Sequence, residues 1–184
     1  MTPRDPVELT DAAKRAMGLQ DYGRPPEIEG VQVVDLKRFT DDGGSFLELA
    51  RLEHGAAAAL SGFECRQVNY SEMDPGVIKA FHIHRRQTDV WFVPPGDKML
   101  LVLLDVRAGS RTTNLQRRLV LGDGTCRLVR IPPGVAHGVK NLASARGRII
   151  YLVDEQFRVA PDECDEGRLP WDFAGAEIWD VARG

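Results

Sequence analysis

The residues best suited to chemistry are histidines and one carboxylate in two short segments. His82 and His84 are one residue apart in a β-type sequence, so their side chains point to one face of the expected strand. Asp89 follows five residues after His84, and His137 lies far along the chain in residues 132–141. Only a β-barrel or β-sandwich would bring these groups together, so their spacing indicates both the fold and a shared site.

The elements that must position these side chains are predicted to be short strands. Gly and Pro punctuate the apolar runs at regular intervals, a pattern typical of a sandwich or barrel. Residues 98–106 are almost continuously apolar, which predicts a central strand buried on both faces. Gly122, Asp123 and Gly124 follow residues 116–121 and predict a hairpin. The other predicted strands are 31–36, 45–50, 66–71, 76–84, 89–93, 127–131, 135–141 and 148–153.

The two ends of the chain differ from this β pattern. Residues 5–19 have helical spacing, so residues 1–26 are predicted to form an N-terminal helix and linker. Residues 27–160 form the predicted β domain. The acidic, irregular residues 161–184 are expected to pack on that domain as a C-terminal tail, with Trp171 and Trp179 attaching it.

The composition is that of a soluble globular protein of one ordinary domain. The chain has 184 residues, of which 43% are hydrophobic and 28% charged. A net charge of -3 gives no reason to expect nucleic acid or an anionic membrane as a partner. The three cysteines include no CxxC pair, which argues against a disulfide framework or a zinc ribbon. The absence of a signal peptide and of a membrane-spanning run leads us to expect a cytoplasmic protein.

The two histidine segments resemble the paired motifs of the cupins. The first motif is G(X)5HXH(X)3-4E(X)6G and the second is G(X)5PXG(X)2H(X)3N. The matching residues are Gly76, His82, His84, Gly96, Pro132, Gly134, His137 and Asn141, with Asp89 in place of the glutamate. The resemblance implies an all-β fold of the cupin type, a double-stranded β-helix or jelly-roll sandwich.

Within the cupins, the chain most resembles the dTDP-4-dehydrorhamnose 3,5-epimerase family. The similarity covers most of residues 30–180 and includes the stretches 67–71, 76–84, 131–138 and 166–172 together with Tyr151. It implies a carbohydrate epimerase of dTDP-rhamnose biosynthesis that acts on a nucleotide-linked 4-keto-6-deoxy sugar. It also implies a homodimer and no required cofactor.

The resemblance assigns roles to individual residues. His82 matches the family's base, which removes a proton beside a keto group, and Tyr151 matches the acid that returns one on the opposite face. Lys79 would contact the anionic part of the substrate. Gln67 and Asn69 would bind sugar or phosphate, and His137 would line the same pocket.

Several positions depart from the family pattern. The family pairs its base with an aspartate in a C-terminal element that does not follow Asp180 here, so we expect His82 to lack a carboxylate partner. His84 replaces a glutamine, and Asp89 replaces a lysine. These two changes restore the ligand types of a metal-binding cupin.

A second interpretation therefore stays open for the same residues. His82, His84, Asp89 and His137 would suit a divalent ion of Fe, Mn, Ni, Zn or Cu. The protein would then be a metal-dependent dioxygenase or sugar isomerase. A third interpretation is a sugar-binding cupin without catalysis.

Overall fold

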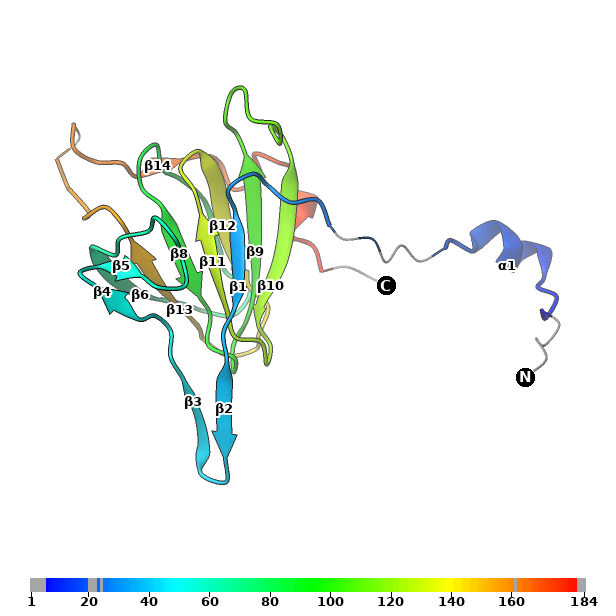
Figure 1. Cartoon of the computed structure of the whole chain (residues 1–184). Coiled ribbons are helices and arrows are strands. Elements are labelled where there is room, and N and C mark those ends of the chain that lie inside the picture. Colours follow the sequence, from blue (N-terminus) through cyan, green and yellow to red (C-terminus); the bar gives the residue numbers. More distant parts are fainter. Residues whose placement is uncertain (1–5, 20–22, 24, 161, 182–184) are drawn as a thin grey trace.

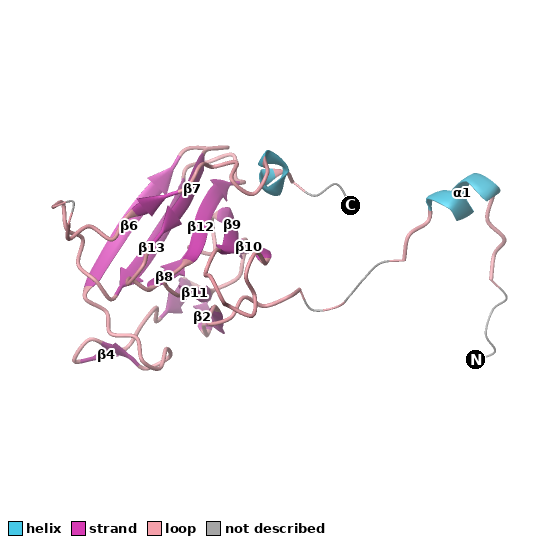
Figure 2. Ribbon diagram, turned by 90° about the horizontal axis from the view of Figure 1, so that it is seen from above, coloured by secondary structure: helices cyan, strands magenta, loops and turns pink. Residues whose placement is uncertain are grey.

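Two five-stranded antiparallel sheets stack face to face and confirm the predicted jelly roll (Figures 1 and 2). The computed structural model describes residues 6–19, 23, 25–160 and 162–181. The first sheet has the order β1 (Gln32–Asp35), β11 (Arg127–Ile131), β8 (Asp89–Phe92), β13 (Gly147–Val153) and β6 (Gln67–Met73). The second sheet has the order β10 (Gln116–Gly122), β9 (Lys98–Asp105), β12 (Val135–Asn141), β7 (Ile78–Ile83) and β14 (Gly167–Arg168).

Strand β9 is buried on both faces, as its apolar run predicted. Its alternate residues Met99, Leu101 and Leu103 belong to the core between the sheets. The intervening leucines and valine contact a second cluster that includes Trp179 of the short 3-10 helix η1 (Ala176–Trp179). The C-terminal segment therefore covers the outer face of the second sheet.

The two tryptophans of this segment have different environments. Trp179 is 1% exposed and packs on Phe81, with 5.4 Å between ring centroids. Trp171 is 47% exposed and contributes its backbone carbonyl, which accepts a hydrogen bond from Trp179 Nε1. Trp179 therefore anchors the segment, whereas Trp171 contributes through its backbone and leaves its side chain about half exposed.

The glycine-rich turn at residues 122–124 is a crossover between sheets, so the predicted hairpin is wrong. Strand β10 pairs with β9, whereas β11 pairs with β1 and β8. Gly122 has a φ of +74°, and a Cβ atom there would lie 2.2 Å from the backbone oxygen of Asp97. The turn needs glycine for this close approach, and the same composition would also suit a hairpin.

A separate two-stranded hairpin projects from the sandwich in Figure 1. It consists of β2 (Arg38–Asp41) and β3 (Gly44–Leu47). Phe39 and Phe46 lie opposite each other on it and are 49% and 65% exposed. The alternating pattern in the sequence predicts only the second of these strands. The short strands β4 (Leu52–Glu53) and β5 (Ala56–Ala57) form another small hairpin.

The N-terminal helix α1 (Asp11–Ala16) is shorter than the predicted helix over residues 5–19, of which residue 5 lies outside the described part. The Thr10 hydroxyl caps it by accepting a hydrogen bond from the Ala13 amide. None of its residues is buried, and without tertiary packing a short helix is only marginally stable, so no packing energy extends it over the predicted length. In the described ranges, no helix has the length and apolar character needed to span a membrane.

Candidate active site

A cavity of 650 Å³ takes its lining from both sheets. Strands β7, β12 and β14 contribute from the second sheet, and β6, β8 and β13 contribute from the first. The lining residues are Ser71, Lys79, His82, His84, Gln87, Asp89, Trp91, His137, Val139, Ile149, Tyr151, Phe157, Glu166 and Arg168. Six of the eight site residues singled out in the sequence are in this set.

Antiparallel pairing of β7 with β12 brings the distant histidines together. His82 is the register partner of His137, and their rings stack with centroids 5.9 Å apart. The ring of His84 lies 5.5 Å from that of His137. The structure therefore gathers all three imidazoles in one cavity, as their spacing predicted.

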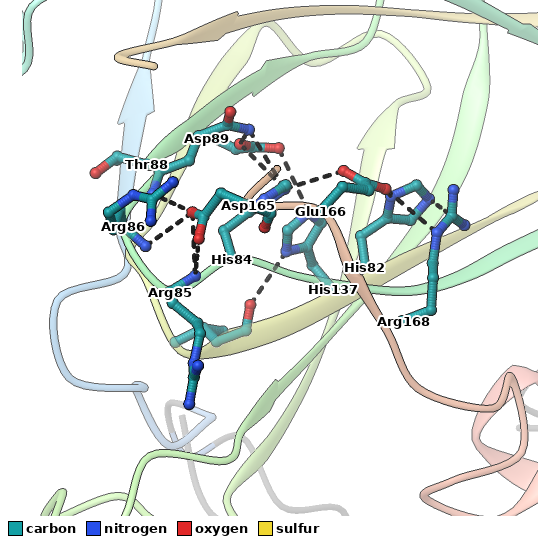
Figure 3. Close-up of polar contacts among 12 residues, drawn as sticks. His82, His84, Arg85, Arg86, Thr88, Asp89, His137, Asp165, Glu166 and Arg168 are labelled. Atoms are coloured by element: carbon teal, nitrogen blue, oxygen red, sulfur yellow. Dashed lines mark hydrogen bonds and ion pairs between the residues drawn. The ribbon is translucent and has the colours of Figure 1, made fainter. Parts of the chain in front are cut away.

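His82 has a carboxylate partner, so the expectation of an unpaired imidazole is wrong. Its Nδ1 lies 2.5 Å from Glu166 Oε1, and its Nε2 lies 3.0 Å from Arg168 Nη1 (Figure 3). A guanidinium only donates hydrogen bonds, so Nε2 accepts and the ring proton is on Nδ1. The hydrogen bond from His82 lowers the pKa of Glu166 despite the opposing effect of burial. This arrangement gives a base with its lone pair on Nε2.

The C-terminal segment brings Glu166 to this position. Strand β14 pairs with β7, and Arg168 is the register partner of His82. The Asp165 carboxylate accepts hydrogen bonds from the backbone amides of Arg85, Arg86 and Gln87 in the turn after β7. These contacts fix the chain on both sides of Glu166. The stretch 166–172 belongs to the family resemblance, but no sequence pattern assigns a role to Glu166, because a two-residue strand has no recognisable periodicity.

A second polar group lies deeper in the cavity. His84, Asp89 and His137 are 4%, 3% and 2% exposed. Asp89 Oδ2 lies 3.4 Å from His137 Nε2, and its Oδ1 lies 3.8 Å from His84 Nε2. Burial alone would raise the pKa of Asp89, but interactions with His137, His84 and Trp91 lower it to about 2. The proposed four-residue metal set thus lies in one cavity, although both ring nitrogens of His82 face other partners.

Tyr151 enters the cavity from the opposite sheet. It lies on β13 of the first sheet, whereas His82 lies on β7 of the second. Burial, followed by the negative charges of Asp89 and Glu166, raises the pKa of Tyr151. The phenol is therefore protonated near neutral pH and can donate a proton.

The predicted substrate ligands have different positions. Lys79 lines the cavity, and its Nζ donates to the Glu72 carbonyl at 3.0 Å. Gln67 and Asn69 lie on the inward face of β6 that also carries Ser71, and they hydrogen-bond to each other at 2.7 Å. Ser71 lines the cavity, whereas Gln67 and Asn69 are not among its lining residues.

Relatives and solved structures resemble this chain over most of its length. It is 39% identical over 145 residues to the spore coat polysaccharide biosynthesis protein SpsL of Bacillus subtilis, covering 79% of this chain and 91% of SpsL. It is 28% identical to the probable low-salt glycan biosynthesis epimerase Agl13 of Haloferax volcanii, covering 80% and 90%. A dTDP sugar isomerase from Desulfovibrio desulfuricans superposes with a TM-score of 0.70 at 26% identity, covering 80% of this chain and 88% of that one.

The sequence profile of one family spans the described sandwich and the segment that carries Glu166. This profile, described as dTDP-4-dehydrorhamnose 3,5-epimerase, matches residues 25–174. The cavity, the paired histidine and the tyrosine all lie within the matched residues. The chain therefore belongs to the dTDP-4-dehydrorhamnose 3,5-epimerase family.

Proposed function

We propose that this enzyme, an isomerase, inverts a stereocentre beside the keto group of a nucleotide-linked 4-keto-6-deoxy sugar, with His82 as base and Tyr151 as acid. One observation carries the proposal: a carboxylate-paired imidazole and a protonated phenol line the same cavity from opposite sheets. A substrate between them would present opposite faces of one carbon to the two groups. Inversion requires removal of a proton from one face and its return to the other.

The proposed reaction keeps all electrons within the substrate. His82 Nε2 takes the proton, the C–H electron pair forms a C=C bond, and the keto oxygen becomes negative. The enolate then collapses as the Tyr151 hydroxyl protonates the carbon, and solvent restores both side chains. Glu166 stays ionised, accepts a hydrogen bond from the His82 Nδ1–H and stabilises the imidazolium, as carboxylates do in comparable dyads.

Two cations at the cavity support an anionic substrate. Arg168 is 59% exposed and contacts His82 Nε2, so it must move aside when the sugar enters. Lys79 lines the same cavity. We propose that both side chains bind the nucleotide's phosphates, and that Gln67 and Asn69 contact the substrate beyond Ser71. Family membership does not favour the two rival interpretations, a dioxygenase-type metalloenzyme and a non-catalytic sugar-binding protein.

Replacing Tyr151 by phenylalanine tests whether His82 removes the proton and Tyr151 returns one. The variant should still incorporate solvent deuterium into dTDP-4-keto-6-deoxyglucose, because His82 can remove a proton and return a deuteron to the same face. Formation of the inverted product should fall by roughly 10²-fold or more. Mass spectrometry measures incorporation, and proton NMR measures inversion.

Tyr70→Phe is the matched control, because this tyrosine is 60% exposed on the outer face of β6. It should leave both rates unchanged. Inversion at the wild-type rate by the Tyr151→Phe enzyme would exclude Tyr151 as the acid.

We also propose that the protein is a homodimer that uses the hairpin β2–β3. Phe39 and Phe46 form a tilted pair with centroids 6.4 Å apart on this projecting hairpin. Exposed aromatic pairs of this kind favour contact with another protein surface. The family resemblance makes a second copy of the chain the proposed partner.

Replacing both phenylalanines by serine should convert the dimer into a monomer in sedimentation velocity experiments. Loss of the two rings, which the dimer would bury, would remove several kcal/mol of association free energy, at roughly 1.5–3 kcal/mol each. Val120→Ser is the control, because Val120 is 41% exposed on β10 and is not part of the hairpin. A dimer of unchanged stability in the double variant would refute this interface.

A further inference from the structure

Beside the proposed base, two histidines and an aspartate converge inside the protein. His84 follows β7, Asp89 begins β8, and His137 lies on β12, so both sheets contribute (Figure 3). One potential ligand atom from each residue lies within 4.8 Å of the other two. In the part of the chain that the structure describes, this is the only such group of His, Cys, Asp and Glu side chains.

Backbone carbonyls set the orientation of both imidazoles. His84 Nδ1 lies 2.9 Å from the Asp165 oxygen, and His137 Nδ1 lies 3.1 Å from the Val135 oxygen. Carbonyls only accept hydrogen bonds, so each Nδ1 bears a proton and each Nε2 of a neutral ring bears a lone pair. Metal-binding histidines are held in this way, with the nitrogen that does not bind metal donating to a carbonyl or carboxylate.

His84 Nε2 lies 3.3 Å from Gln87 Nε2 and 3.7 Å from Glu166 Oε2, and the Nε2 atoms of both histidines lie near the Asp89 carboxylate. Their distances to its nearer oxygens are 3.8 Å for His84 and 3.4 Å for His137. Ligands about 2.0–2.2 Å from a shared ion would be roughly 3.0–3.5 Å apart, which is close to these separations. Asp89 also accepts hydrogen bonds from Gln87 Nε2 at 2.7 Å and from Trp91 Nε1 at 3.0 Å. A cation among the three groups would bind the lone pairs that remain.

We propose that His84, Asp89 and His137 bind one divalent first-row transition metal ion. Two imidazoles and one carboxylate are ligands that such ions accept, with further coordination positions left open. His82 lies outside this set, because its Nδ1 pairs with Glu166 and its Nε2 is the atom that takes the proton in the proposed reaction. The site therefore differs from the four-residue set considered from the sequence.

The position of this site gives the ion a role that rests on the proposed function. The three ligands line the same cavity as His82 and Tyr151. When bound, the ion would supply a Lewis acid that stabilises negative charge on the keto oxygen. His82 would still act as the base, and its ring stacks on that of the ligand His137.

Metal titration of the purified full-length protein tests the site directly. After dialysis against a chelator, the protein should take up one Co²⁺ or Zn²⁺ per chain, measured by visible absorption for Co²⁺ and by elemental analysis for both. Zn²⁺ should also raise the melting temperature of the wild type, because it binds only the folded state. This second readout requires no substitution.

Four substitutions locate the bound ion. His137→Asn and Asp89→Asn should weaken metal binding by at least about 100-fold and abolish the Zn²⁺-dependent rise in melting temperature. His82→Asn should bind the ion as the wild type does, because His82 is not one of the three proposed ligands. His54→Asn should also bind it normally, because His54 is exposed and lies outside the cavity. Unchanged metal affinity in His137→Asn would overturn the assignment.

The alternative interpretation of these side chains requires no metal. In it, a protonated His137 pairs with Asp89, and the Gln87 amide donates a hydrogen bond to Asp89 at 2.7 Å. Failure of the wild type to take up either ion would support this alternative and overturn the proposal. Deuterium exchange tests the epimerase separately. Metal uptake without exchange would reject the proposed function alone, whereas exchange without metal uptake would reject the metal site alone.

Discussion

The His82→Asn variant is expected to lose about 10²–10⁴-fold in the rate of deuterium exchange into dTDP-4-keto-6-deoxyglucose. Asparagine keeps a polar side chain but has no lone pair of comparable basicity to remove the proton. Mass spectrometry measures the initial rate of deuterium incorporation at saturating substrate. His54→Asn serves as the control, because it removes an exposed histidine that has no role in the site.

The Glu166→Gln variant should show a smaller loss of exchange, on the order of 10–100-fold. Glutamine can still contact Nδ1 but cannot stabilise the imidazolium with a negative charge. Arg168 would also lose its ion-pair partner, which lies 3.2 Å from its Nε. If exchange in Glu166→Gln equals that of the wild type, the carboxylate does not position or stabilise the base.

The Asp105→Asn variant is expected to lower the free energy of unfolding by about 2–4 kcal/mol. Asp105 is completely buried and accepts hydrogen bonds from the Arg107 guanidinium, the Ser110 hydroxyl and the Thr112 hydroxyl. Asparagine would leave the guanidinium without its counter-charge and present an amide group to the hydroxyl donors. Urea unfolding at neutral pH, followed by fluorescence, measures the change.

Asp35→Asn is the matched control for this substitution. Asp35 pairs with Arg127 at 2.7 Å, but its side chain is 77% exposed, and exposed pairs contribute at most about 1 kcal/mol. A loss in Asp105→Asn no larger than that in Asp35→Asn would contradict the structural role of the buried network.

The same network predicts a pH dependence of stability. Burial raises the pKa of Asp105, but hydrogen bonds from Arg107, Thr112 and Ser110 outweigh it and hold the pKa below its ordinary value. Because the folded state favours the ionised form, the stabilisation is complete above about pH 4 and is lost as the pH falls further. The difference in unfolding free energy between wild type and Asp105→Asn should therefore narrow below about pH 4.

Much of the fold could be predicted because its physical signals are local. Strand β9 has a continuous apolar run, and glycines and prolines separate most of the other strands. The hairpin predicted at residues 122–124 is wrong, because residues with positive φ suit either a hairpin or a crossover between sheets. The strand after this turn, β11, joins the first sheet because it pairs with β1 and β8. This pairing has no signal in the local sequence.

The candidate site was only partly predictable for a similar reason. The alternate spacing of His82 and His84 placed both near one cavity, and the second motif added His137. The partner of His82 lies 84 residues away and is held by a two-residue strand and by the Asp165 carboxylate. Such contacts depend on how distant segments pair in the folded protein. Residues 161–181 have no periodic sequence pattern from which this pairing could be predicted.

The segment that carries Glu166 also determines when, during synthesis of the chain, the active site is completed. A ribosome releases the chain from the N-terminus onward, so the histidines and the tyrosine emerge before residue 166. The same late segment supplies Trp179, which closes the outer face of the second sheet. A nascent or clipped polypeptide without these residues would have an imidazole but no carboxylate to orient it, so turnover would begin only after residues 166–179 have been made and have packed onto the second sheet.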